Sequence, residues 1–165
     1  MEAILDLVRR YSSRGILVDT NILLLLLVGL FDRKQISRFK RTSQFTEADY
    51  DLLVALLANF QRIVTSPNIL TEVSNLSGQF KDPSRAAYFG HFAASIAEFD
   101  ERYIVSGTAS QMPQFSQLGL TDCGILHLAK DRYVVLTDDT LLYLFSQDAG
   151  IDVINFNYIR EFGRS

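Results

Sequence analysis

Short apolar runs rich in β-branched residues alternate along the chain with longer helix-forming segments. Runs of this kind predict strands, and the chain has five of them, at residues 16–18, 63–65, 103–105, 133–137 and 152–156. Strands separated by helices are joined by right-handed crossovers, which make neighbouring strands parallel. The pattern therefore predicts an α/β fold, in which residues 1–165 form a single three-layer domain with helices flanking a mostly parallel central sheet.

Capping residues and prolines indicate where the helices begin. The segment from Thr46 to Asp49 has the form of a capping box, and Ser66-Pro67 joins an N-cap residue to a proline at the first helical position. Asp82-Pro83 repeats the second signal. The expected helices cover residues 22–28, 47–60, a segment starting at 67, residues 83–99, residues 122–130 behind a Thr121 cap, and residues 140–147, while 106–117 are a polar loop or short helix.

Composition narrows the class of protein. The chain has 165 residues, 48 % of them hydrophobic, which suits one compact core. A formal net charge of -3 excludes a generally basic protein that coats nucleic acid. One cysteine and two histidines exclude an internal disulfide and a Cys/His zinc module, so a reducing cytoplasm is the expected location. The most apolar stretch, residues 16–31, contains Asp19 and is short for a bilayer span, so no membrane association is expected.

Acidic residues stand at four junctions between the predicted strands and helices. Asp19 ends the first strand, and Glu72 lies in the second turn of the helix that follows the second strand. Asp122 begins the helix before the fourth strand, which itself ends on Asp138 and Asp139. Because the carboxyl ends of parallel strands meet at one edge, we expect these side chains to gather there. Gathered carboxylates repel one another unless a cation binds, and all-oxygen ligands favour Mg²⁺ or Mn²⁺, although each acid alone is more simply explained as a cap or turn residue.

Four motifs lie in a regular order across nearly the whole chain. They are ILVDTNILL at 16–24, TSPNILTEVSNL at 65–76, LGLTDCGILHLAK at 118–130 and VVLTDDTLLY at 134–143. Together they resemble the PIN domain of the wider flap-nuclease-like group. The resemblance implies a PIN-like fold, and RNA cleavage by a carboxylate cluster with magnesium or manganese that leaves a 5′-phosphate and a 3′-hydroxyl.

The resemblance also implies roles for individual acids. Asp19, Glu72, Asp122 and Asp139 match the four catalytic acids of the family. The implied metal ligands are Asp19, Asp122 and Asp139, with Asp138 beside them acting through an outer-shell water, and Glu72 is the candidate for water activation or outer-shell coordination. Polar side chains that orient the first acid are implied at Thr20, Asn21 and Thr137.

A basic segment separates the first helix from the second. It has no acid between residues 33 and 46, and topology requires it to return towards the edge where the acids gather. Its cations are expected to bind substrate phosphates, unless the segment is only a solvated helix face. These residues are Arg33, Lys34, Arg38, Lys40 and Arg41.

The sequence thus predicts a divalent-metal-dependent endoribonuclease, a phosphodiester hydrolase that acts on RNA. Many bacterial PIN proteins are VapC-type toxins, so the resemblance implies an antitoxin protein and a homodimer as candidate partners. The leucine run at 23–27 is apolar on all sides, and either a second subunit or the domain core would cover it. The main alternative is a non-catalytic PIN-like module that binds RNA or protein. A dehalogenase-like phosphotransferase is disfavoured, because it needs Asp-x-Asp where this chain has Asp19-Thr20-Asn21.

Overall fold

A single five-stranded sheet forms the centre of the protein, for which a computed structural model describes residues 2–163. All neighbouring strands are parallel, and their order is β3-β2-β1-β4-β5. The strands are β1 (Ile16–Val18), β2 (Ile63–Thr65), β3 (Asp100–Glu101), β4 (Val134–Thr137) and β5 (Val153–Asn155). In the centre of the sheet Leu17 of β1 is in register with Val64 of β2 and Val135 of β4. The predicted α/β class is therefore confirmed.

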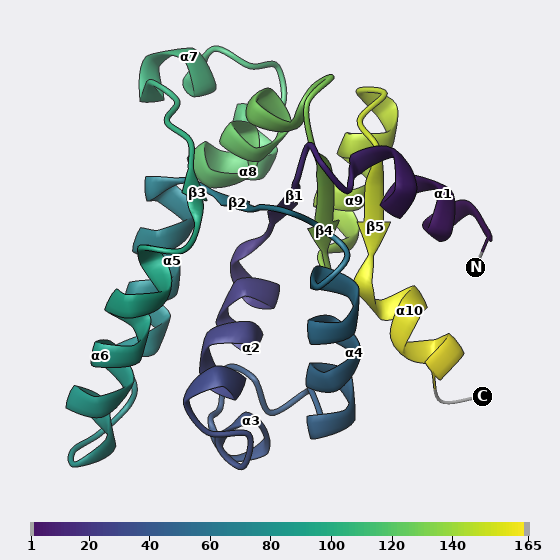
Figure 1. Ribbon diagram of the computed structural model, residues 1–165. Helices are drawn as coiled ribbons and strands as arrows, with labels where there is room; N and C mark the ends of the chain where they lie inside the picture. The colour runs from purple at the N-terminus through teal and green to yellow at the C-terminus, as the bar shows by residue number, and fades with distance from the viewer. Residues whose placement is uncertain (1, 164–165) are drawn as a thin grey trace.

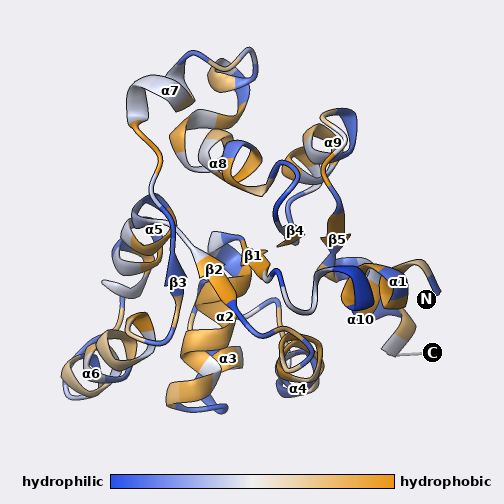
Figure 2. Cartoon of the chain, turned by 45° about the horizontal axis from the view of Figure 1, so that its top comes forward, coloured by the Kyte–Doolittle hydropathy of each residue, from blue (hydrophilic) through white to orange (hydrophobic). Residues whose placement is uncertain are grey.

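Helices cover both faces of the sheet (Figure 1). Figure 2 shows the strands side by side, with α8 and α9 on one side of the row and α2, α3, α4 and α6 on the other. The first and last helices lie beyond the β5 end of the sheet in both views. The helices are α1 (Glu2–Tyr11), α2 (Thr20–Phe31), α3 (Gln35–Arg38), α4 (Glu47–Leu57), α5 (Pro67–Ser77), α6 (Ser84–Ile96), α7 (Ser106–Ser110), α8 (Phe115–Ala129), α9 (Thr140–Asp148) and α10 (Phe156–Gly163).

The leucine-rich helix α2 is the centre of the core. Leu23 to Leu27 are all 5 % exposed or less, so the chain itself covers the run that a second subunit could have covered. α2 packs against α4, α5 and α6, which explains why it is apolar on every side. Within residues 2–163, none of the helices combines the length and apolar character needed to cross a bilayer.

Two of the predicted helix starts follow the capping pattern. The Thr46 hydroxyl accepts a hydrogen bond from the Asp49 N–H at 3.1 Å, and the Asp49 carboxylate accepts one from the Thr46 N–H at 2.8 Å. Ser66 Oγ accepts from the Ile69 N–H, and Pro67 is the first residue of α5. These bonds join residues three apart, so local sequence is sufficient to predict them.

Three local predictions are wrong. The third strand lies at Asp100–Glu101, not 103–105, because its partner β2 ends at Thr65 and offers no further residues for pairing. Thr121 is not the cap of its helix: Gly119, with a φ of 77°, interrupts α8, the helix resumes directly after it, and the Thr121 hydroxyl donates to a side chain of α5 and does not cap. The Asp82-Pro83 signal supplies no side-chain cap, because Pro83 itself occupies the N-cap position of α6.

Candidate active site

The strand order of the sheet reverses between β1 and β4, and the acids of interest lie at the carboxyl ends of these two strands. From β1 the chain moves to β2 and β3 on one side, and it then crosses to β4 and β5 on the other. Ligands of open α/β sheets bind where the strand order reverses in this way. Asp19 directly follows β1, and Asp138 directly follows β4, so both stand at the reversal point.

Asp19 is buried and firmly held. Its side chain accepts hydrogen bonds from the Thr20 N–H at 2.6 Å and from the Thr137 hydroxyl at 2.7 Å. Its own N–H donates to the Leu136 carbonyl at 3.0 Å, which fixes its backbone against β4. Burial raises the pKa of Asp19 to about 6; the two hydrogen bonds oppose this rise, and the charges of the neighbouring acids add to it.

Glu72 projects from α5 and is held by two threonines from other helices. The Thr20 hydroxyl donates to Oε2 at 2.9 Å, and the Thr121 hydroxyl donates to Oε1 at 2.6 Å. Thr121 is thus a site residue that sequence reasoning misread as a helix cap. The TD pair in the third motif was the available signal, because it puts a hydroxyl next to an implied acid.

Asp122 differs from Asp19 and Glu72 in having no hydrogen-bond donor among residues 2–163 to offset the repulsion of the surrounding acids. Burial raises its pKa to about 7, and the negative charges of Asp19, Asp139 and Glu72 contribute to the rise, in that order. The side chain is half-buried, and within residues 2–163 it accepts no hydrogen bond and forms no ion pair. An ionised Asp122 therefore has three carboxylates acting on it and no donor that offsets them.

Asp139 serves as a helix cap at the same edge. Its carboxylate accepts a hydrogen bond from the Leu142 N–H at 2.9 Å, and its own N–H donates to Thr137 Oγ1 at 2.9 Å. Thr137 thus links the two strand ends, because its hydroxyl also donates to Asp19. The four implied catalytic acids therefore come from four different junctions and act on one another electrostatically at a single edge.

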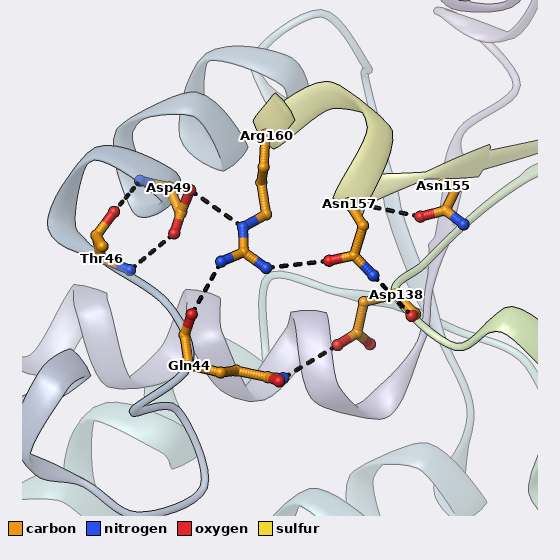
Figure 3. A network of polar contacts seen from close by, with 7 residues as sticks. All are labelled: Gln44, Thr46, Asp49, Asp138, Asn155, Asn157 and Arg160. Atoms are coloured by element: carbon orange, nitrogen blue, oxygen red, sulfur yellow. Dashed lines mark hydrogen bonds and ion pairs between the residues drawn. The ribbon is translucent and has the colours of Figure 1, made fainter. Parts of the chain in front are cut away.

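Asp138 points towards the segment that leads into α4 (Figure 3). The Gln44 side chain donates to its Oδ2 at 3.2 Å, whereas the buried Oδ1 has no hydrogen-bond partner among the described residues. Burial raises the pKa of Asp138, while the nearby Asn21 amide lowers it. Asn21, expected to orient the first acid, thus acts on Asp138, and no described hydrogen bond joins it to Asp19.

A polar network from α10 supports this side of the site (Figure 3). The Arg160 guanidinium forms an ion pair with Asp49 at 3.1 Å and donates to the Gln44 carbonyl at 2.8 Å and to Asn157 Oδ1 at 3.0 Å. Asn157 in turn donates to the Asp138 carbonyl at 3.0 Å. Arg160 and Asn157 carry no sequence signal, because the sequence predicts no helix after the fifth strand, and the partners of Arg160 near the start of α4 lie about a hundred residues earlier in the chain.

The five cations of the basic segment have different surroundings in the structure. Arg33 pairs with Asp51 at 2.8 Å and with Glu47 at 3.4 Å, so its charge is directed to the surface of α4. Lys34 and Arg38 are exposed and contact none of the site acids among the described residues. Lys40 and Arg41, in contrast, line a hollow together with Asn21.

The acids have the right chemistry for a hard divalent cation, but they are not arranged as a finished metal site. No group of three or more His, Cys, Asp or Glu side chains within residues 2–163 could hold a metal ion in the present arrangement. The donor set is nevertheless all oxygen, which suits Mg²⁺ or Mn²⁺. Asp122 without a donor and the unpartnered Oδ1 of Asp138 are two oxygens that a cation would satisfy.

Comparison with known proteins assigns no family to this arrangement. No family model matches the sequence, and no curated protein matches it either.

Proposed function

We propose that the protein is a divalent-metal-dependent endoribonuclease of the PIN type that hydrolyses RNA phosphodiester bonds. The observation that carries the proposal is Asp122, a half-buried carboxylate with a pKa raised to about 7 and three other acids acting on it. A folded protein gains nothing in stability from such an arrangement, and a bound cation would remove the repulsion. Asp19, which acts on Asp122, stands at the reversal point of the sheet, where α/β proteins bind ligands.

Asp19 and Asp122 would hold the cation, with Asp139 and Asp138 beside them. When bound, the cation would supply a water activated for attack on phosphorus and charge stabilisation for the leaving oxygen. Asp19 is kept in one orientation by Thr20 and Thr137. In the proposed reaction the oxygen of the attacking water bonds to phosphorus while a Glu72 oxygen accepts its proton; the P–O bond to the leaving oxygen breaks, and that oxygen takes a proton from Glu72 or from solvent.

A second candidate is a non-catalytic module that binds RNA or a protein. Two observations favour it: Glu72 accepts hydrogen bonds from two threonine hydroxyls, and Asp139 caps α9, so both acids already have a structural role. The same arrangement lacks a group that could hold a metal among the described residues. The two candidates differ in whether a divalent cation binds at Asp122.

The decisive experiment compares Asp122→Asn with the wild type in two measurements. The first is the thermal stability of each protein in EDTA and with added Mn²⁺. The second is cleavage of single-stranded and structured RNA with and without Mn²⁺, with Asp19→Asn as a second variant. Mn²⁺ should stabilise the wild type, since it binds only the folded site, and it should stabilise Asp122→Asn much less.

Asp148→Asn is the matched control, because it removes the same charge from an exposed position at the end of α9. Its activity and its response to Mn²⁺ should equal those of the wild type. RNA cleavage by the wild type that is lost in both site variants supports the nuclease. A wild type that neither cleaves RNA nor responds to Mn²⁺ would instead favour the binding module.

The proposal extends to the setting of the reaction. We place the enzyme in the cytoplasm, as its single buried cysteine suggests. An antitoxin protein and a homodimer are proposed partners on the basis of the motif resemblance alone. Sedimentation of the purified chain, alone and with the product of an adjacent reading frame, tests both.

A further inference from the structure

A hollow beside the acids has the chemistry of a phosphate site. It lies between the start of α2, the segment leading to α4 and the last part of α5, and it has a volume of about 400 Å³. We call it the basic hollow; its lining residues are Asn21, Lys40, Arg41, Ser43, Gln44 and Leu76. Two of them are cations, three are neutral polar residues and none is an acid.

The cations of the basic hollow are not neutralised by the protein. Within residues 2–163 neither Lys40 nor Arg41 forms an ion pair, whereas other arginines of the chain, such as Arg33 and Arg160, are paired with carboxylates. Arg41 is oriented by an amide: with the Gln79 oxygen facing the guanidinium, Nη2 and Nε donate to it at 3.0 Å each. A neutral partner fixes the guanidinium and leaves its charge available to an anion.

The basic hollow shares two walls with the acid site. Asn21 lies two residues after Asp19 and acts on Asp138. Gln44 lines the basic hollow and donates to Asp138 Oδ2, and its carbonyl is held by Arg160 (Figure 3). The network around Arg160 therefore fixes the basic segment next to the acids.

We propose that the basic hollow binds a backbone phosphate of the RNA adjacent to the phosphodiester that is cleaved. The inference rests on the proposed function for the identity of the polyanion. The uncompensated charges of Lys40 and Arg41 attract a phosphate, while Ser43 and the two amides offer neutral hydrogen-bonding groups. Two phosphates in a row, one at the acids and one in the basic hollow, would align the strand across the edge of the sheet.

The test uses RNA binding in EDTA, so that cleavage is not required. The full-length chain is titrated with a fluorescent single-stranded RNA of about twelve nucleotides, and anisotropy is read at several salt concentrations. Lys40→Gln/Arg41→Gln is compared with Lys34→Gln/Arg38→Gln, which removes two exposed cations from the same segment outside the basic hollow. Circular dichroism and melting curves establish that both double variants are folded.

The variant of the basic hollow should bind RNA at least about tenfold more weakly, with a salt dependence smaller by one to two ions, and the control should change less than about threefold. Equal losses in the two double variants, or no RNA binding by the wild type, would overturn the inference. The inference is also wrong if Lys40→Gln/Arg41→Gln loses binding of inorganic phosphate but keeps its affinity for RNA, because the basic hollow would then bind a free anion and not the RNA backbone.

Cleavage with Mn²⁺ separates this inference from the proposed function. If the wild type cleaves RNA, the variant of the basic hollow should have a raised KM and a nearly unchanged kcat, because the acids are intact. If the wild type binds RNA through Lys40 and Arg41 and cleaves none, the proposed function fails while the phosphate site stands.

Discussion

Replacing Asp122 by asparagine is expected to stabilise the metal-free protein at neutral and alkaline pH. The substitution keeps the shape of the side chain and removes its charge. In the wild type that charge is half-buried, and Asp19, Asp139 and Glu72 act on it. No described hydrogen bond to the carboxylate is lost, so the change removes repulsion and desolvation with little structural cost.

The pKa shift of Asp122 determines how much the stability of the wild type changes with pH and in which direction. The pKa of Asp122 rises from 3.8 to about 7 on folding, so the folded state holds the proton more tightly than the unfolded state. The unfolding free energy of the wild type therefore falls as the pH rises from about 4 to about 7, and it stays low above that. At about 1.4 kcal/mol for each pKa unit, a rise of about three units corresponds to somewhat more than 4 kcal/mol, and solvent screening at this half-buried position reduces the cost of ionisation to a value on the order of 2 to 4 kcal/mol.

The assay is thermal and urea unfolding in EDTA at several pH values between about 4 and about 8. At the alkaline end Asp122→Asn should melt roughly 5 to 10 °C above the wild type, and the difference should vanish at the acidic end. The exposed control Asp148→Asn should stay within about 0.5 kcal/mol of the wild type throughout. A gain that does not depend on pH, or no gain at the alkaline end, would refute the electrostatic reasoning.

Two further predictions concern packing and the network of α10. Gly29→Ala should lower the unfolding free energy measured in urea by about 1 to 3 kcal/mol, because an added Cβ would lie 2.2 Å from the Tyr50 ring. Gly90→Ala in α6, where an added Cβ meets no atom within 4 Å, should raise it by about 0.5 to 1 kcal/mol. A stabilised Gly29→Ala would contradict the close approach of α2 and α4. Arg160→Met should lower the unfolding free energy by about 3 kcal/mol, because it leaves the buried Asp49 carboxylate without the guanidinium. Adding Asp49→Asn to this variant should recover part of the loss. If the double variant shows the simple sum of the two single effects, the ion pair is not the cause.

Local chemistry was enough to predict most helices and the edge at which the acids gather. The caps at Thr46, Ser66 and Asp139 bond to backbone groups three residues away, so each is contained in a short stretch of sequence. The strand runs that precede Asp19 and Asp138 are equally local. Once the strands are parallel, their carboxyl ends must share an edge, and no further information is needed to bring those acids together.

The third strand shows where local chemistry fails. Tyr103 to Val105 has the better β-forming composition, but the strand lies at Asp100–Glu101. Pairing is available only as far as β2 extends, and Thr65 is the last residue of β2. The position of an edge strand is thus decided by its neighbour, because hydrogen bonds between strands, more than propensity, define it.

The sequence by itself determined the α/β class, the helix starts capped by Thr46, Ser66 and Asp139 and the set of acids at the strand ends, because each depends on residues within a few positions of one another. Only the tertiary structure decided how each acid is used: Thr20 and Thr121 hold Glu72, while Asp122 meets repulsion without a donor. Only the fold showed that Lys40 and Arg41 line the basic hollow, whereas Arg33 is paired with Asp51. The physical reason is that burial, hydrogen bonding and charge at these positions come from side chains tens of residues away, whose directions depend on strand order and helix packing.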